Sequence, residues 1–407
     1  MLLVYDIFRF GFFIVFVGLH ALLMAGLVLE RRRDTSACVS FAEKYEKPES
    51  NVPLPLVSII VPIHNETRRM DGLLQSIKSQ QYKNSEFIFI NDRSTDGSAA
   101  VLREFMMNEI SRGHMRDGTQ DSVQGNGQSL PVMRIITLDK NPGPNYKQYA
   151  LGKGIDASRG EFILFTDADC VIPPAWIVSM VKRMSDPKTG AVLGPVLRKP
   201  EGRGFFHLYQ CFEHAVRYMY LAASTGIGAA GGGFGNNLIL RRESLDAVGG
   251  YASVPPSPTE DAALISIIRS HSKYKVRAGL GKDQHVLTWG EDNWKDFVTQ
   301  TLRWNNGGLF GPDIATRINF GFLMITISMG ILAIPVLPFI PSLWPLSAAV
   351  ILSMSANTIA TLVLFGVSLP KKGAAYIIQC VFTPMYFTFL TILGFCGIRP
   401  KWKGSEK

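Results

Sequence analysis

Charged side chains are missing from long stretches near both ends of this chain, although it carries 42 basic and 33 acidic residues in all. Near the start, residues 10–29 contain no Lys, Arg, Asp or Glu. About 20 helical residues at roughly 1.5 Å rise can cross the roughly 30 Å of bilayer hydrocarbon, so one membrane span is predicted here. The run is followed by Glu30 and three arginines rather than by a small-residue cleavage site, which makes a cleaved signal peptide the weaker alternative.

Three more apolar runs, 318–338, 343–369 and 373–397, predict about three further spans. Lys and Arg favour the cytoplasmic side, so the basic residues at 31–33 and 371–372 mark cytoplasmic ends. Four complete spans would then place a basic tail on the opposite side. We therefore expect one segment to be broken or interfacial, with a break at one of Pro335, Pro338, Pro341 and Pro384.

Cysteine is scarce and odd in number, and the five cysteines show no metal-ligand spacing, which favours a reducing compartment. The net charge of +9 raises the possibility of nucleic-acid binding. Zinc-finger, RNA-recognition and helix-turn-helix patterns are absent, however, and much of the positive charge flanks the apolar segments. Anionic lipid headgroups explain the charge more simply than nucleic acid.

The middle of the chain alternates short β-branched runs with stretches of helical periodicity, which predicts an α/β fold. The expected strands are 57–62, 87–90, 132–137 and 161–165, forming a mostly parallel sheet with helices on both faces. A polar, Gly-rich insertion is expected over 111–130. The predicted organisation is an anchor at 1–33, a linker at 34–55, a soluble domain at 56–312, a membrane region at 313–398 and a basic tail at 399–407.

Ligands of open parallel sheets bind beyond the carboxyl ends of the strands, where this chain is polar. Asp167 and Asp169 flank one alanine there, so both carboxylates point the same way. Their repulsion and their hard oxygen atoms favour Mg²⁺ or Mn²⁺ shared with a substrate phosphate. A solvated turn or a helix cap is the alternative for this pair. Asp92 follows the second strand and could accept hydrogen bonds from a base or ribose, whereas Asp96 is predicted to cap a helix.

Three later motifs could also carry function. The glycine-rich run 231–235 predicts a loop that permits close backbone approach, and it lacks the Lys-Ser/Thr of a nucleoside-triphosphatase loop. Glu260 and Asp261 open a predicted helix, where one of them could be a general base; a capping box with Thr259 as cap is the alternative. The third motif lies on a predicted helix, 293–306, and could clamp a diphosphate or anchor to lipid headgroups: Gln300, Arg303 and Trp304.

In this order the motifs resemble glycosyltransferase family 2, the inverting enzymes with a GT-A fold, and in particular its membrane-embedded branch. The resemblance covers about 57–304 and the flanking topology. It implies that Asp167 and Asp169 bind donor and metal, with Asp261 as base and Glu260 as its neighbour. It implies that Gln300, Arg303 and Trp304 shape the acceptor channel and hold the diphosphate, and that the nucleotide is held by Pro62, Asn65, Glu66, Asp92 and Lys147.

The implied reaction is a single displacement with inversion, in which Asp261 deprotonates an acceptor hydroxyl and a metal-bound nucleoside diphosphate leaves. The implied donor is a nucleotide-sugar, with UDP the first expectation, and the acceptor is a lipid or polysaccharide at the inner membrane, with the catalytic domain in the cytoplasm. A processive polysaccharide synthase and a single-transfer lipid glycosyltransferase both remain open. A non-catalytic membrane receptor for a nucleotide or anionic lipid is the alternative of another class.

Overall fold

A computed structural model describes residues 2–47, 52–118, 130–199, 201–202, 204–257, 259–311, 313–365 and 373–400. The chain divides into two compact units. The sheet unit comprises Glu30–Val196 and Gly232–Trp289, and the helical unit comprises Met1–Leu29, Leu197–Gly231 and Gly290–Glu406. Residues 197–231 and 290–311, which the sequence assigns to the soluble domain, thus belong with the apolar helices.

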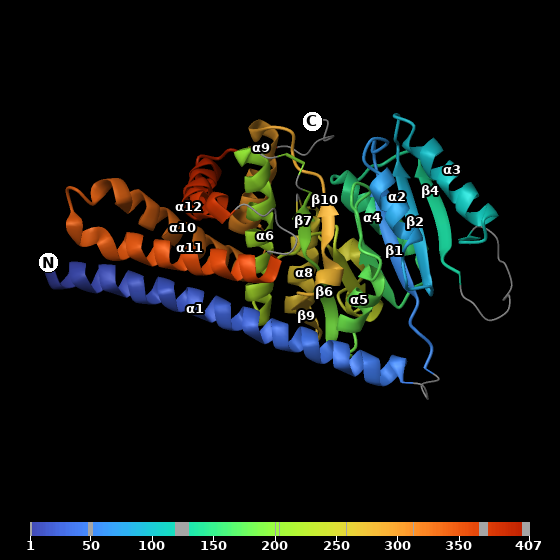
Figure 1. Cartoon of the computed structure of the whole chain (residues 1–407), viewed down its shortest axis with the longest axis horizontal. Coiled ribbons are helices and arrows are strands. Elements are labelled where there is room, and N and C mark those ends of the chain that lie inside the picture. Colours follow the sequence, from blue (N-terminus) through green and yellow to red (C-terminus); the bar gives the residue numbers. More distant parts are fainter. Residues whose placement is uncertain are drawn as a thin grey trace. The chain divides into compact units, whose positions relative to one another are not determined.

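The sheet unit is built on an eight-stranded sheet in the order β3-β4-β2-β1-β5-β8-β6-β9. Figure 1 shows β1, β2 and β4 side by side, and all three run parallel with β5, whereas β8 is antiparallel to both of its neighbours. The strands are β1 (Val57–Ile63), β2 (Ser85–Asp92), β3 (Arg116–Asp117), β4 (Val132–Leu138), β5 (Phe162–Phe165), β6 (Thr189–Leu193), β8 (Leu238–Arg241) and β9 (Lys275–Ala278). Two short strands complete the set, β7 (Val196–Arg198) and β10 (Val286–Thr288).

The four predicted strands are confirmed as β1, β2, β4 and β5, and helices alternate with them as predicted, among them α4 (Tyr146–Ala157). Asn145 caps α4 by accepting the N–H of Gln148 at 3.1 Å. The helices of this unit are α2 (Asp71–Lys78), α3 (Ser98–Ser111), α4, α5 (Trp176–Arg183), α7 (Arg242–Asp246), α8 (Glu260–His271) and the 3₁₀ turns η2 (Tyr251–Ser253) and η3 (Lys282–Gln284). The predicted insertion at 111–130 lies mostly outside the described residues.

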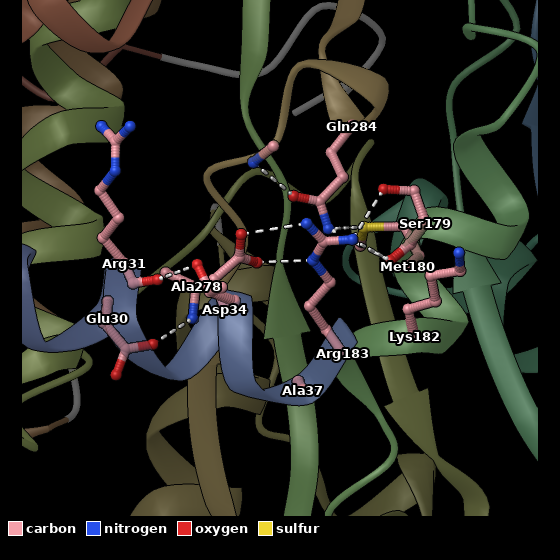
Figure 2. Close-up of polar contacts among 12 residues, drawn as sticks. Glu30, Arg31, Asp34, Ala37, Ser179, Met180, Lys182, Arg183, Ala278 and Gln284 are labelled. Carbon is pink, nitrogen blue, oxygen red and sulfur yellow. Dashed lines mark hydrogen bonds and ion pairs between the residues drawn. The ribbon is translucent and has the colours of Figure 1, made fainter. Parts of the chain in front are cut away.

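The predicted linker at 34–55 is wrong over its first part, because helix α1 (Leu2–Phe41) continues through it into a π-helical turn, η1 (Ala42–Glu46). The reason is a set of tertiary contacts that Figure 2 shows. Arg183 holds Asp34 through two hydrogen bonds of 2.5 and 3.0 Å. Buried Glu30 accepts the N–H of Ala278 at 3.0 Å, on the edge strand β9. The helix can continue through these polar residues because the carboxylates of Glu30 and Asp34 accept hydrogen bonds from Ala278 and Arg183.

We expect Asp34→Ala to lower the free energy of unfolding of the sheet unit by about 3 kcal/mol, since it leaves Arg183 without its carboxylate in a poorly hydrated place. The side chains of both residues are only 10% exposed. The measurement is the denaturant midpoint of the full chain in detergent. The matched control is Glu43→Ala, which changes an exposed residue of η1. It is expected to shift the free energy of unfolding by less than about 0.5 kcal/mol. Equal midpoints for the two variants would contradict the role of the ion pair.

Three described helices are long and apolar enough to cross a membrane, Asp6–Glu46, Ile314–Val336 and Pro341–Phe365, and a shorter apolar stretch covers Val381–Phe395. The helical unit contains α6 (Phe205–Gly226), α9 (Trp294–Phe310), α10 (Ile314–Ala333), α11 (Trp344–Phe365) and α12 (Gly373–Phe395), with 3₁₀ turns η4 (Ile334–Val336) and η5 (Pro341–Leu343) between α10 and α11. Pro335, Pro338 and Pro341 therefore lie in a turn between two helices, while Pro384 lies inside α12.

Helix α6 was not among the predicted elements, and its packing shows the role of small residues. Gly26 of α1 and Gly226 of α6 approach so closely that a Cβ atom on Gly226 would overlap the backbone of Gly26. Small residues of this kind allow helix backbones to meet inside a membrane protein. The part of α1 before Glu30 and the end of α6 are thereby joined within the helical unit.

Candidate functional site

The site lies at the carboxyl ends of two neighbouring parallel strands. Strand β1 is followed by Glu66, and β5 by Asp167 and Asp169. In this sheet β2 and β4 lie on one side of β1 and β5 lies on the other, so the connections diverge between β1 and β5. Such a switch point leaves a crevice where ligands of open α/β sheets bind. Glu66, Asp167 and Asp169 lie close enough for their charges to act on one another, and their ligand roles stay predictions.

Lys147, on α4, joins acidic residues of two other segments. Its ammonium group lies 2.7 Å from Oδ1 and 2.9 Å from Oδ2 of Asp167, and 3.9 Å from Glu260. Burial acts to lower the pKa of Lys147, but Asp167, Glu260 and Asp261 outweigh it, so the pKa is raised and the side chain stays charged. The first turn of α4, the end of β5 and the start of α8 therefore meet at one cation.

A second acidic group lies beside this ion pair. Burial, followed by the charges of Asp169 and Asp167, raises the pKa of Glu66 to about 7. Burial and the charge of Asp167 also raise the pKa of Asp169, whose Oδ2 accepts a hydrogen bond from Thr288 at 3.1 Å. Both shifts express burial first and, second, the repulsion of carboxylates that share a small volume. A divalent cation would relieve that repulsion.

The carboxylates of this cluster fit a hard cation that keeps part of its shell for water and phosphate. Asp167 and Asp169 are half-buried, with oxygen atoms of the kind that Mg²⁺ and Mn²⁺ prefer. The described residues contain no group of three or more His, Cys, Asp or Glu side chains arranged as a complete cage. A two-carboxylate site suits a metal that binds together with a diphosphate, because the phosphate oxygens supply the remaining ligands.

Glu260 and Asp261 begin α8, but the capping box with Thr259 is wrong. Thr259 precedes the helix without a side-chain capping hydrogen bond. Asp261 instead accepts the N–H of Gly235 at 2.8 Å on Oδ2 and the N–H of Ala262 at 2.7 Å on Oδ1. Burial, the largest influence, raises the pKa of Glu260 to about 7, with Asp261 adding to the rise and Lys147 opposing it. The start of α8 thus presents a hydrogen-bonded carboxylate beside a second, buried carboxyl group.

Gly235 is a functional candidate that sequence reasoning described only as part of a glycine-rich loop. A Cβ atom there would lie 3.3 Å from both the Cβ atom and Oδ2 of Asp261. Such contacts are tight, so a larger residue must move the carboxylate or the loop. The glycine run 231–235 was the available signal, but its partner lies 26 positions further along the chain.

We expect Gly235→Ala to lower sugar transfer about tenfold with little change in donor affinity, because it displaces the carboxylate of Asp261 by a fraction of an ångström. Steady-state rates at saturating donor, together with donor binding by calorimetry, separate these effects. Gly113→Ala is a poorer comparison because Gly113 has a positive φ of 70°, so Gly204→Ala, where a Cβ would meet nothing within 4 Å, is the control. Full activity of Gly235→Ala would show that the close approach is unimportant.

A hydrogen bond joins Asn65, a predicted nucleotide residue after β1, to the loop that follows β2. Asn65 adopts a left-handed backbone with φ of 57°, which costs a non-glycine residue about 1 kcal/mol, and its Oδ1 accepts the N–H of Thr95 at 2.8 Å. Pro62 is half-buried within β1. Such strain is usually retained near functional sites.

Asp92 is less available than the sequence suggests. It is buried, its Oδ1 accepts a hydrogen bond from Arg93 at 2.8 Å, and its Oδ2 accepts one from Asn141 at 2.7 Å. The guanidinium of Arg93 lies 4.5 Å from the ring centre of Tyr146. Asp92 therefore holds Arg93 and Asn141 in place. A base or ribose would have to donate to the remaining lone pairs of its carboxylate oxygens.

Gln300, Arg303 and Trp304 lie on α9, as predicted, and α9 belongs to the helical unit. Within that unit, Gln300 accepts a hydrogen bond from Arg198 and donates one to Glu291 at 2.8 Å. The ring of Trp304 lies 5.4 Å from that of His214, between ring centres, and 5.2 Å from the guanidinium of Arg217. Trp304 therefore packs against α6, and Gln300 is held by Arg198 and Glu291.

Comparison with known families agrees with this arrangement. Residues 162–395 match the model of glycosyl transferase family group 2, and residues 58–249 match that of glycosyl transferase family 2. The first match covers more than half of the chain. The chain belongs to glycosyltransferase family 2. The matched regions of this family 2 member include the carboxyl ends of β1 and β5 and the helices α9 to α12.

Two curated relatives of this family 2 member have informative names. It is 28% identical over 262 residues to a poly-beta-1,6-N-acetyl-D-glucosamine synthase of Staphylococcus epidermidis, covering 62% of this chain and 54% of the relative. It is 26% identical over 237 residues to a beta-monoglucosyldiacylglycerol synthase of Nostoc, covering 58% of this chain and 43% of the relative. The chain spans about half the length of the curated relatives it matches.

A solved structure supports the fold of the family 2 member. The mannosyltransferase PcManGT from Pyrobaculum calidifontis, in complex with GDP-Man and Mn²⁺, is 16% identical, with a TM-score of 0.51 over 93% of this chain and 99% of that chain. At this identity the likeness concerns the fold. The fold is α/β of the GT-A type, as predicted.

Proposed function

We propose that this chain is a membrane-anchored, inverting glycosyltransferase that moves a hexose or N-acetylhexosamine from a nucleotide-sugar to a lipid-linked or polysaccharide acceptor. The observation that carries the proposal is the convergence of Asp167, Lys147, Glu260 and Asp261 at the switch point of the sheet. A general base and a cation-binding carboxylate within one small volume are what a single displacement needs. The family membership supports it.

In this mechanism Asp261 removes a proton from an acceptor hydroxyl as that oxygen attacks the anomeric carbon. Its two N–H donors, from Gly235 and Ala262, fix the orientation of the carboxylate. Buried Glu260 pairs with Lys147 and stands beside the base. Asp167 and Asp169 would hold Mg²⁺ or Mn²⁺, which, when bound, neutralises the diphosphate of the departing nucleotide. Glu66, Asn65, Asp92 and Pro62 would surround the nucleotide.

We propose that the acceptor enters along α9, where Gln300, Arg303 and Trp304 would bind acceptor and diphosphate. The catalytic unit would face the cytoplasm of the inner membrane, where a nucleotide-sugar such as a UDP-sugar is available. The poly-beta-1,6-N-acetyl-D-glucosamine synthase relative favours a polysaccharide product. The beta-monoglucosyldiacylglycerol synthase relative favours a glycolipid product, so single transfer to a lipid is the second candidate.

The proposed function is tested by product analysis. The full chain, purified in lipid nanodiscs, is incubated with each of a panel of nucleotide-sugars, Mn²⁺ and membrane lipid extract, and products are identified by mass spectrometry. A product series that differs by one sugar repeat indicates polymer synthesis, and a single glycolipid indicates single transfer. Release of free sugar alone, or no donor consumption across the panel, would reject glycosyl transfer in favour of a binding role.

A further inference from the structure

The sheet unit has a cavity apart from the acidic cluster. It lies on the side of α4 that faces away from the buried strands. Its volume is about 320 Å³, which reaches the range of about 300 to 1,000 Å³ that is typical of small-molecule sites. One wall is the face of α4 and the turn before it, and the other is the segment 251–256 that includes η2. Lys147 is not among the residues that line the cavity, so it is separate from the acidic cluster.

The chemistry of the lining is aromatic and polar with little net charge. Tyr149 and Tyr251 supply rings, Asn145 and Gln148 supply amides, and Lys153 and Asp156 form a pair 3.9 Å apart. A nucleotide or phosphate would need unpaired cations here, whereas the wall combines amide groups with a larger apolar area that includes Pro144, Val254 and Pro256. Tyrosine rings beside amides instead suit a neutral sugar, whose ring has an apolar C–H face and a rim of hydroxyl groups.

One buried acceptor atom in this wall has no partner among the described residues. Gln148 donates from Nε2 to the carbonyl oxygen of Val254 at 2.9 Å, which fixes the orientation of its amide group. Its Oε1 atom is buried and accepts no hydrogen bond from any described residue. A buried unsatisfied acceptor costs about 1 to 3 kcal/mol, so a ligand hydroxyl or amide N–H is favoured if a small movement of the Gln148 amide uncovers this atom, which has almost no exposed surface.

The cavity is tied to the transfer site through both of its walls. The α4 wall continues into Lys147, and the opposite wall leads along the chain to Glu260. Asn145 joins the two walls by donating to the carbonyl oxygen of Ser257 at 2.7 Å. Tyr251 lies close enough to Glu260 and Asp261 for their charges to add to the rise of its pKa that burial causes. A ligand in the cavity would therefore contact the loop that carries the proposed base.

We propose that this cavity binds a sugar unit of the acceptor glycan, as a site separate from the donor site. The inference rests on the proposed function for the identity of the glycan as acceptor, and its binding test needs no catalysis. The ligand class is an uncharged hexose or N-acetylhexosamine oligomer. Its ring packs on the tyrosines and one of its donors reaches Oε1 of Gln148, while the loop at 251–257 is held in place for Asp261.

Gly152 provides a direct way to close the cavity. It lies on the cavity face of α4, and a Cβ atom there would make ordinary contact with the ring of Tyr251 at 3.5 Å. Gly152→Leu should fill the cavity without steric conflict at the backbone, and replacement of a helical glycine favours the helix by about 1 kcal/mol. Ala100→Leu, on the exposed face of α3, is the matched control for an added leucine.

The test uses the full chain in nanodiscs and saturation-transfer NMR with the tetramer of N-acetylglucosamine and with cellotetraose. We expect at least one tetramer to bind the wild type and the Ala100→Leu chain equally, and to bind Gly152→Leu about tenfold more weakly or not at all. UDP-sugar binding should be equal in all three. Absence of tetramer binding in the wild type, or unchanged binding in Gly152→Leu, would overturn the acceptor site, whereas the donor panel decides glycosyl transfer independently.

Discussion

Asp261→Asn is expected to lower the rate of sugar transfer about 10³-fold while donor affinity stays within about twofold, because general base catalysis contributes about 10² to 10⁴ to rate. The amide keeps an oxygen that can accept the N–H of Gly235, which Asp261 accepts at 2.8 Å, so the loop should remain in place. What is lost is the ability to take a proton, together with the hydrogen bond from the N–H of Ala262, which an amide NH₂ cannot accept. The measurements are single-turnover transfer of a radiolabelled sugar and calorimetric binding of the donor.

Asp246→Asn is the matched control for this change, since it replaces an exposed aspartate at the end of the short helix α7. It should leave both rate and affinity unaltered. If Asp261→Asn transferred sugar at the wild-type rate, the base would have to be another residue, and buried Glu260, with a pKa raised to about 7, would be the next to test.

Asp169→Asn is expected to weaken Mn²⁺ binding at least tenfold and to lower transfer about 100-fold, because it removes one of two anionic ligands from the proposed metal site. Burial and the charge of Asp167 raise the pKa of Asp169, which means that its carboxylate is ionised at a cost that a cation would offset. Electron paramagnetic resonance of Mn²⁺ titrated into the full chain reports binding without any turnover. Asp246→Asn again serves as the control.

Chelation gives a complementary result. Treatment with EDTA should stop transfer, and added Mn²⁺ or Mg²⁺ should restore it in the wild type but not in Asp169→Asn at the same metal concentration. Equal Mn²⁺ signals from Asp169→Asn and the wild type would remove this residue from the metal site. Full transfer after exhaustive chelation would remove the metal from the mechanism altogether.

The two variants, Asp261→Asn and Asp169→Asn, change different residues of one acidic cluster. Lys147 connects the two parts of this cluster. It bonds Asp167 at 2.7 Å and lies 3.9 Å from Glu260. Because residues in one network are not additive, the double variant Asp169→Asn and Asp261→Asn should lose less than the product of the single losses.

The sequence by itself determined the strand ends and the motifs that follow them. Continuous apolar runs such as Val57–Ile63 predict buried parallel strands. The period of two along a strand does not reach Asp167 and Asp169, because β5 ends at Phe165 and these residues lie in the turn that follows. Features that depend on residues close in the chain could be predicted, and the apolar membrane helices are among them.

Only the tertiary structure decided which distant residues meet. Gly235 donates to Asp261, Asn141 donates to Asp92, and Arg183 donates to Asp34 in the predicted linker. Each partner lies far away in the sequence. The same holds for the cavity between α4 and η2. Local patterns encode backbone preference and burial, whereas the pairing of a given donor with a given acceptor depends on how the elements pack.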